Sequence, residues 1–150
     1  RINKKTGKDQ YVVPSLMSSH PGSTLNDAIT LAEYLRDHKL SPQQVQDFYP
    51  TPGTISPAMF YTGLDPYTLE EVYVAKSDKE KRIQRALMQY YRPENKALII
   101  EGLKMAGRTD LIGNTSNCLV KGAPPPIKKQ NPTNKGKNKG KKPQNRGKKR

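Results

Sequence analysis

Two turns of nearly the same composition, separated by a helix-length segment, place the strongest constraint on how this chain folds. The first turn, HPGST at 20–24, follows the apolar run 11–18. The second turn, TPGT at 51–54, follows the shorter apolar run 45–49. Apolar runs that end in Pro, Gly, Ser and Thr are typical of buried strands followed by tight turns. The sequence therefore predicts a β-turn-α-β unit, in which a right-handed crossover makes the two strands parallel.

The segment from Leu25 to Lys39 has the signals of a regular amphipathic helix. Ser23 or Thr24 can accept hydrogen bonds from the first-turn amides, and Asp27 complements the positive end of the helix dipole. The apolar residues form one stripe along the helix: Leu25, Ala28, Ile29, Ala32 and Leu35. The strand at 11–18 is mostly apolar on both faces, so we expect helices to cover it.

Residues 55–120 follow a different pattern and predict a small α+β region. The run Ile55 to Lys76 contains two β-rich stretches around a Gly/Asp-Pro turn, which predicts a hairpin. Ser77-Asp78-Lys79-Glu80 has the form of a capping box, and the helix that it opens ends before Pro93. Pro93 suits the first position of another helix, which ends at Gly107. We expect these two helices to pack antiparallel over the hairpin.

The formal charge of +14 is distributed unevenly along the chain. Residues 121–150 hold twelve Lys and Arg residues and no acidic residue, whereas residues 1–120 hold fifteen basic and thirteen acidic residues. The basic segment is rich in Pro, Gly and Asn, and Ile127 is its only sizeable apolar residue. Such a segment buries too little apolar surface to offset its chain entropy, so we expect residues 121–150 to form a disordered basic tail.

Cysteine content and hydropathy restrict the compartment and the kinds of site. The chain has one cysteine, Cys118, so neither an internal disulfide nor a metal site of several cysteines is expected. This usage is typical of a reducing compartment, and we expect a cytoplasmic protein. No apolar run reaches the roughly 18–20 residues of a membrane span, so no membrane partner is expected. Residues 1–7 resemble the last turns of a helix, which suggests a longer parent polypeptide.

Several strings in the chain are specific enough to indicate a family. SSHPGST, QDFYPTPGT and YYRPENKALIIEGLKMAGRTDLIG occur in this order. With their flanking residues they resemble the carboxyl-terminal region of the YgiQ-type radical SAM proteins, an uncharacterised family, over nearly all of residues 1–120. The resemblance implies a parent enzyme that cleaves S-adenosylmethionine reductively with a [4Fe–4S] cluster held by a CxxxCxxC loop. That loop is absent here, so both cofactors are expected in the parent protein and this chain alone is not expected to be an enzyme.

The same resemblance implies an α/β fold divided into three parts. Residues 1–54 would form the last βαβ unit of a partial (βα)6 radical SAM barrel. Residues 55–120 would form the carboxyl-terminal extension of the family, with the hairpin and two helices, and residues 121–150 the tail. Two strands cannot close a barrel and would expose apolar edges. We therefore expect the amino-terminal remainder of the same polypeptide to be the main partner.

The first turn is the candidate site for S-adenosylmethionine, because ligands of parallel sheets bind at the carboxyl ends of the strands. The expected contacts are His20, Gly22, Ser23 and Thr24. The amide groups that open a helix are suited to hold a carboxylate or hydroxyl of a ligand. The alternative is structural: His20 makes local hydrogen bonds in the turn, and the hydroxyl groups only cap the helix.

The second turn is the candidate site for the unknown substrate, through Asp47, Thr51 and Pro52. A carboxylate that points into a barrel interior requires a partner. The alternative for Asp47 is an exposed position at the strand edge. The two strand tips are expected to lie side by side and to border a pocket that the rest of the parent protein completes.

Other conspicuous side chains are expected to be structural. Tyr61, Tyr73, Tyr90 and Tyr91 occur at hairpin or helix spacing, which is more typical of a core than of a stacking surface. Cys118 is expected to be a small buried apolar residue rather than a reactive thiol.

A second class of function starts from the tail. The cations of residues 128–150 would make weak, non-specific and salt-dependent contacts with nucleic acid, but they have no aromatic residues between them for base stacking. This favours either a solubilising appendage or a non-catalytic module that binds RNA or ribosomal surfaces.

Overall fold

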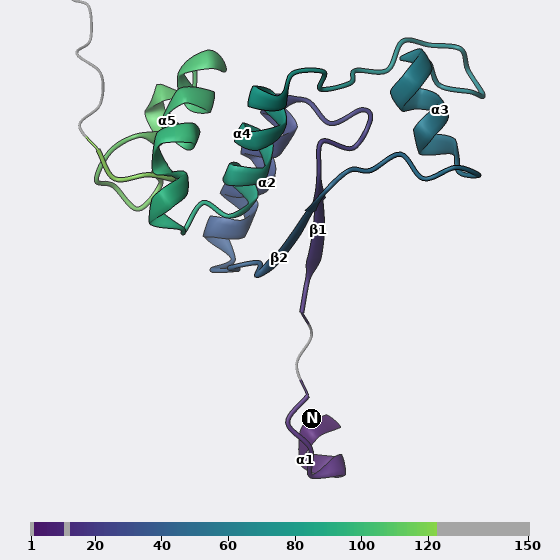
Figure 1. Ribbon diagram of the computed structural model, residues 1–150. Coiled ribbons are helices and arrows are strands. Elements are labelled where there is room, and N and C mark those ends of the chain that lie inside the picture. The colour runs from purple at the N-terminus through teal and green to yellow at the C-terminus, as the bar shows by residue number, and fades with distance from the viewer. Residues whose placement is uncertain (1, 11–12, 123–150) are drawn as a thin grey trace, which may run out of the picture.

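The computed structural model describes residues 2–10 and 13–122, and its elements follow one another as Figure 1 shows. Two short 3-10 helices, η1 and η2, flank the last α-helix. The order is α1 (Ile2–Thr6), β1 (Ser15–Ser18), α2 (Leu25–Asp37), β2 (Gln44–Asp47), α3 (Ile55–Thr62), α4 (Asp78–Met88), η1 (Pro93–Asn95), α5 (Lys96–Met105) and η2 (Thr109–Leu111). The tail beyond residue 122 and the predicted strand positions 11 and 12 lie outside the described residues.

β1 and β2 form a parallel pair in which Leu16 is opposite Val45 and Ser18 is opposite Asp47. This confirms the predicted β-turn-α-β unit, although β1 begins later than the apolar run does. Val45 is buried, and α4 packs against both strands. Met17, by contrast, is 49% exposed.

α2 forms as the sequence predicts because the backbone amides of Thr24 and Asp27 at its start both have hydrogen-bond partners. Thr24 is the N-cap, and Thr24 and Asp27 complete a reciprocal capping box. The predicted stripe is buried at Ala28, Ile29, Ala32 and Leu35. α2 packs against α4, and Figure 1 shows these two helices between the sheet and α5. The hydrophobic core therefore lies among α2, α4 and α5 rather than within the sheet.

α4 and α5 confirm the predicted helices on either side of Pro93. The Ser77 hydroxyl accepts from the Glu80 amide at 3.2 Å, which is one half of the predicted capping box. The Glu80 carboxylate instead accepts from the Tyr73 hydroxyl and from the Gln84 amide group. η1 begins at Pro93, and α5 packs along α4 and ends before Gly107, whose φ is 71°. Within the described ranges, no helix has the length and apolar character that crossing a membrane requires.

The predicted hairpin in 55–76 is wrong, because its first half is the helix α3. Thr54 provides an extended N-cap, Pro57 is tolerated in the first helical turn, and Gly63 ends the helix in the left-handed region. Only a single antiparallel bridge between Leu64 and Glu71 remains of the hairpin in this loop. α3 buries none of its residues, and Figure 1 shows it away from the helical core. α4 therefore packs against both α2 and α5, and the hairpin over which the two helices were predicted to pack is absent from the described residues.

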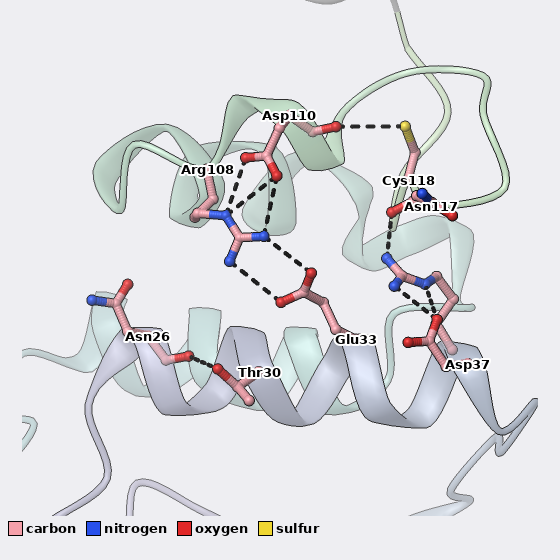
Figure 2. A network of polar contacts seen from close by, with 9 residues as sticks. Asn26, Thr30, Glu33, Asp37, Arg108, Asp110, Asn117 and Cys118 are labelled. Atoms are coloured by element: carbon pink, nitrogen blue, oxygen red, sulfur yellow. Dashed lines mark hydrogen bonds and ion pairs between the residues drawn. The ribbon is translucent and has the colours of Figure 1, made fainter.

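An arginine attaches the segment after α5 to α2 (Figure 2). Arg108 donates to both carboxylate oxygens of Glu33 at 3.0 and 3.3 Å and also to Asp110 at 3.1 Å. Its guanidinium group holds the pKa of Asp110 below the usual range. Nearby, Cys118 is only half-buried, less than predicted, and its thiol lies 3.1 Å from the Thr115 hydroxyl. The partly exposed Arg108 network therefore orients this segment more than it stabilises the fold.

The contact between α4 and α5 predicts that Gly102→Ala destabilises the protein. A Cβ atom at Gly102 would lie 2.3 Å from Ile83 Cγ2, so the helices would have to separate. Alanine normally stabilises a helix interior by about 1 kcal/mol relative to glycine. Here we expect a net loss of about 1–3 kcal/mol in the free energy of unfolding, measured by urea denaturation.

Ile83→Ala provides the control, because it removes the atom that Cβ would meet. In that background, Gly102→Ala should cost much less than in the native chain. Equal losses in the two backgrounds would contradict the proposed contact.

Candidate functional site

The tips of β1 and β2 lie side by side at one edge of the sheet. The Ser18 hydroxyl donates to Asp47 Oδ1 at 2.6 Å, and the Phe48 amide donates to the Ser18 carbonyl at 2.9 Å. The His20 ring meets the Phe48 ring edge-on, with 5.2 Å between centroids. The carboxyl ends of β1 and β2 are therefore adjacent, and the first turn reaches Phe48, the residue after β2. That the turns 20–24 and 51–54 themselves lie side by side stays a prediction.

His20 links the first turn to α3. Its Nδ1 lies 2.8 Å from the Pro21 carbonyl oxygen, and its Nε2 lies 3.0 Å from the Ser56 hydroxyl. A carbonyl oxygen only accepts, so in the neutral ring Nδ1 carries the hydrogen and Nε2 accepts from Ser56. Both ring nitrogens thus have partners within the chain. The sequence did not indicate Ser56, which is 36 residues away.

The three amide groups of Gly22, Ser23 and Thr24 also have partners within the chain. Gly22 donates to the Tyr73 carbonyl at 2.7 Å, and Ser23 donates to the His20 carbonyl at 2.9 Å. Thr24 donates to Asp27 Oδ2 at 2.8 Å. These amides close the turn on itself and attach it to the loop before α4.

Asp47 has the partners that a carboxylate at this position needs. Besides Ser18, the Arg85 guanidinium group of α4 contacts Asp47 Oδ2 at 2.8 Å. The Asp47 side chain is 47% exposed, so it is oriented but accessible. Thr51 and Pro52 are exposed, and the Thr51 carbonyl accepts from the Thr54 hydroxyl at 3.3 Å. The second turn is therefore exposed to solvent.

Gln84 is the site residue that the sequence analysis missed. Its side chain is fully buried, accepts from the Ser19 amide at 3.1 Å and donates to the Ser23 carbonyl at 3.1 Å. Ser19 itself is buried, and its backbone is in the left-handed region with φ at 58°. Its hydroxyl has no hydrogen-bond partner among the described residues. A polar residue at an apolar position of α4, between Ile83 and Leu87, was the available signal.

A cavity of about 620 Å³ lies between the loop after α3 and the start of α4. Val72, Tyr73, Lys76 and Glu80 are among the residues that line it. Its wall reaches the first turn, because Gly22 donates to the Tyr73 carbonyl. None of the seven candidate strand-tip residues lines this cavity, whereas Ser23 lines a smaller one of about 180 Å³ together with Met17 and Asp27. The pocket that the rest of the parent protein would complete between the two turns stays a prediction.

The chain does not supply the ligands of an iron–sulfur cluster. Such a cluster requires several thiolates, and Cys118 is the single cysteine of the sequence. The part of the chain that the structure describes has no group of three or more His, Cys, Asp or Glu side chains placed to hold a metal. No catalytic step through a cluster is derived from these residues.

Replacement of Gln84 by Met is predicted to destabilise the first turn. Methionine keeps the side-chain volume but leaves the buried Ser19 amide and Ser23 carbonyl without partners. We expect a loss of about 2–4 kcal/mol in the free energy of unfolding, measured by denaturation. Gln89→Met is the matched control, since the buried Gln89 loses one hydrogen bond, to the Gln43 carbonyl at 3.4 Å. Equal effects of the two substitutions would contradict this role for Gln84.

Tyr73 is predicted to make stability depend on alkaline pH. Its hydrogen bond to Glu80, together with desolvation, raises the pKa of Tyr73 from 10.0 to about 12. The folded state therefore favours the protonated phenol. This contribution is complete below about pH 10 and is lost as the pH rises to about 12. Burial also raises the pKa of Tyr90. Tyrosinate absorbance should show a late titration near pH 12 that Tyr73→Phe removes; an unchanged titration curve would refute the assignment.

Comparisons with known proteins identify relatives along most of the chain. The family described as "Domain of unknown function (DUF3362)" matches residues 43–150. A UPF0313 protein of Clostridium perfringens strain 13 is 59% identical over 121 residues, and one of Methanosarcina acetivorans is 60% identical over 120 residues. These matches cover 81% and 80% of this chain, respectively. No solved structure matches the chain.

The chain corresponds to a small share of each relative. It spans 18% of the Clostridium perfringens protein, 16% of the Methanosarcina acetivorans protein and 22% of a UPF0313 protein of Methanocella arvoryzae, to which it is 55% identical over 129 residues. Identities of 55–60% over about four fifths of the chain confirm the predicted relationship. The chain therefore belongs to the DUF3362 family and is a carboxyl-terminal region of the UPF0313, or YgiQ-type, proteins.

Proposed function

We propose that this chain is the closing βαβ unit of a radical SAM barrel in a UPF0313 protein, where its strand tips border the S-adenosylmethionine and substrate pocket. The observation that carries the proposal is the parallel pairing of β1 and β2, with Ser18 bonded to Asp47 and His20 packed on Phe48 at the carboxyl ends. The carboxyl edge of a parallel sheet is where such folds bind ligands.

The small, partly exposed sheet supports the proposal that further polypeptide packs against it. Parallel strands are usually covered on both faces and paired with further strands. Here the described residues provide a sheet of two strands, and Val13 and Met17 are 61% and 49% exposed. The relatives are several times longer than this chain, so they contain enough polypeptide to cover these residues. The proposed partner is the amino-terminal remainder of the same protein.

The roles are divided between this chain and that remainder. The remainder holds the [4Fe–4S] cluster, which together with S-adenosylmethionine supplies radical chemistry. This chain binds S-adenosylmethionine and the substrate and orients them. Asp47 is a carboxylate fixed by Ser18 and Arg85, with half of its side chain exposed to a substrate. His20 offers a ring nitrogen that a ligand can take over from the Ser56 hydroxyl.

The test is S-adenosylmethionine binding by the full-length UPF0313 protein that contains this chain, measured by calorimetry. His20→Ala is expected to weaken binding about tenfold, which corresponds to about 1.4 kcal/mol. His38→Ala is the matched control, because His38 lies at the other end of α2 and bonds to the Tyr34 carbonyl. It should leave binding unchanged.

Ser56→Ala separates ligand contact from turn positioning. It removes the internal partner of His20 but keeps the ring. Binding close to that of the native protein supports direct contact by His20. Unaltered binding by His20→Ala, or an equal loss in Ser56→Ala, would reject it.

A further inference from the structure

A second cavity lies at the carboxyl end of α4, where the chain turns into η1. Its volume is about 410 Å³, and residues from that turn and from 119–121 line it. Tyr90 and Tyr91 form an aromatic wall, with their rings edge to face at 6.0 Å between centroids. Leu119 and Val120, which are buried, contribute an apolar surface.

The aromatic wall is held in place from behind. The Tyr91 hydroxyl donates to the Pro42 carbonyl at 2.8 Å, and Tyr90 packs against the hydrophobic core. Asn95 Nδ2 donates to the Gln89 carbonyl at 3.1 Å, which closes the turn that carries both tyrosines. Each ring is only partly buried, so the wall is fixed and accessible.

The rim of this cavity is cationic. Arg92, Lys96 and Lys121 line it. Arg92 has one acidic neighbour, Glu94, at 3.6 Å, and this exposed pair is weak. Lys96 and Lys121 form no ion pair with another described residue. The rim therefore has an excess of positive charge.

Lys121 also begins the basic tail. From this residue to Arg150 the sequence has twelve cations, no acidic residue and no aromatic residue. The tail can neutralise phosphates but has no ring on which a base can stack. The cavity provides two such rings at the point where the tail begins.

We propose that this cavity binds single-stranded nucleic acid. One base packs against Tyr90 and Tyr91, and the adjacent phosphates contact Arg92, Lys96 and Lys121. Base stacking on aromatic rings beside a cationic surface is the usual means of sequence-tolerant single-strand binding. A duplex keeps its bases stacked internally, so it uses the charges but not the rings. An acidic peptide lacks the planar group that fits the aromatic wall.

The first experiment tests the rim on the full-length UPF0313 protein that contains this chain. Binding of a fluorescent oligouridylate of about 12 nucleotides is followed by anisotropy over a range of salt concentrations. Lys96→Gln is expected to weaken binding and to reduce the slope of log K against log salt by about 0.7. Lys104→Gln, an exposed lysine on the same helix that does not line the cavity, is the matched control. Equal effects of the two variants would overturn the site.

The second experiment tests the rings. Tyr90→Leu should lower the affinity about tenfold, whereas Tyr90→Phe should retain it, because stacking requires the ring and not the hydroxyl. Affinity that is unchanged in Tyr90→Leu, or a duplex of equal length that binds as tightly as the single strand, would show that charge alone binds.

Crosslinking keeps the proposal testable if Tyr90→Leu fails to fold. The native full-length protein is irradiated with an oligonucleotide that contains 4-thiouridine, and the crosslinked peptides are mapped. Crosslinks at Tyr90 or Tyr91 support the cavity; crosslinks confined to the tail overturn it.

Discussion

The position of the first strand tip depends on the buried side-chain amide group of Gln84. Ser19 leaves β1 in a left-handed conformation, and its amide is buried where water does not reach it. A buried donor without a partner is costly in free energy. The left-handed conformation persists because the Gln84 side chain accepts a hydrogen bond from the Ser19 amide and donates one to the Ser23 carbonyl. α4 carries Gln84 and packs against α2, α5 and both strands. One side chain thus connects the helical core to the carboxyl edge of the sheet.

The internal bonding of the strand tips determines what they can offer to a ligand. The amides of the first turn and both nitrogens of His20 already have partners, so recognition there depends on exchange of a hydrogen bond rather than on free donors. Asp47 is different, because its partners orient a carboxylate that stays half exposed. α3 is attached to this edge by Ser56 and buries no residue of its own. The two proposed sites lie at different parts of α4, one beside Gln84 and Arg85 near its middle and one after its last turn.

Local signals predicted the elements whose stability is local. The Thr24–Asp27 capping box and the apolar stripe of α2 lie within one segment, so the sequence contains all that they need. Local signals also explain why the predicted hairpin was wrong. The run from Met59 to Thr62 has β-forming residues, but Pro57 in the first turn and the left-handed Gly63 after the last turn favour a helix. The β preference of the residues in this short run was a weaker signal than the residues at the two ends of the helix.

The sequence by itself determined the approximate limits of α2, α4 and α5 and the parallel order of the strands, because caps, periodicity and crossover handedness act over short distances. It also determined the family and the uneven charge. Only the tertiary structure decided which groups meet. Ser19 and Gln84 are 65 residues apart, Asp47 and Arg85 are 38 apart, and His20 and Ser56 are 36 apart. These contacts form because α4 packs on the sheet and α3 folds back to the first turn. No local pattern encodes such partners, since each is selected by the packing of separate elements.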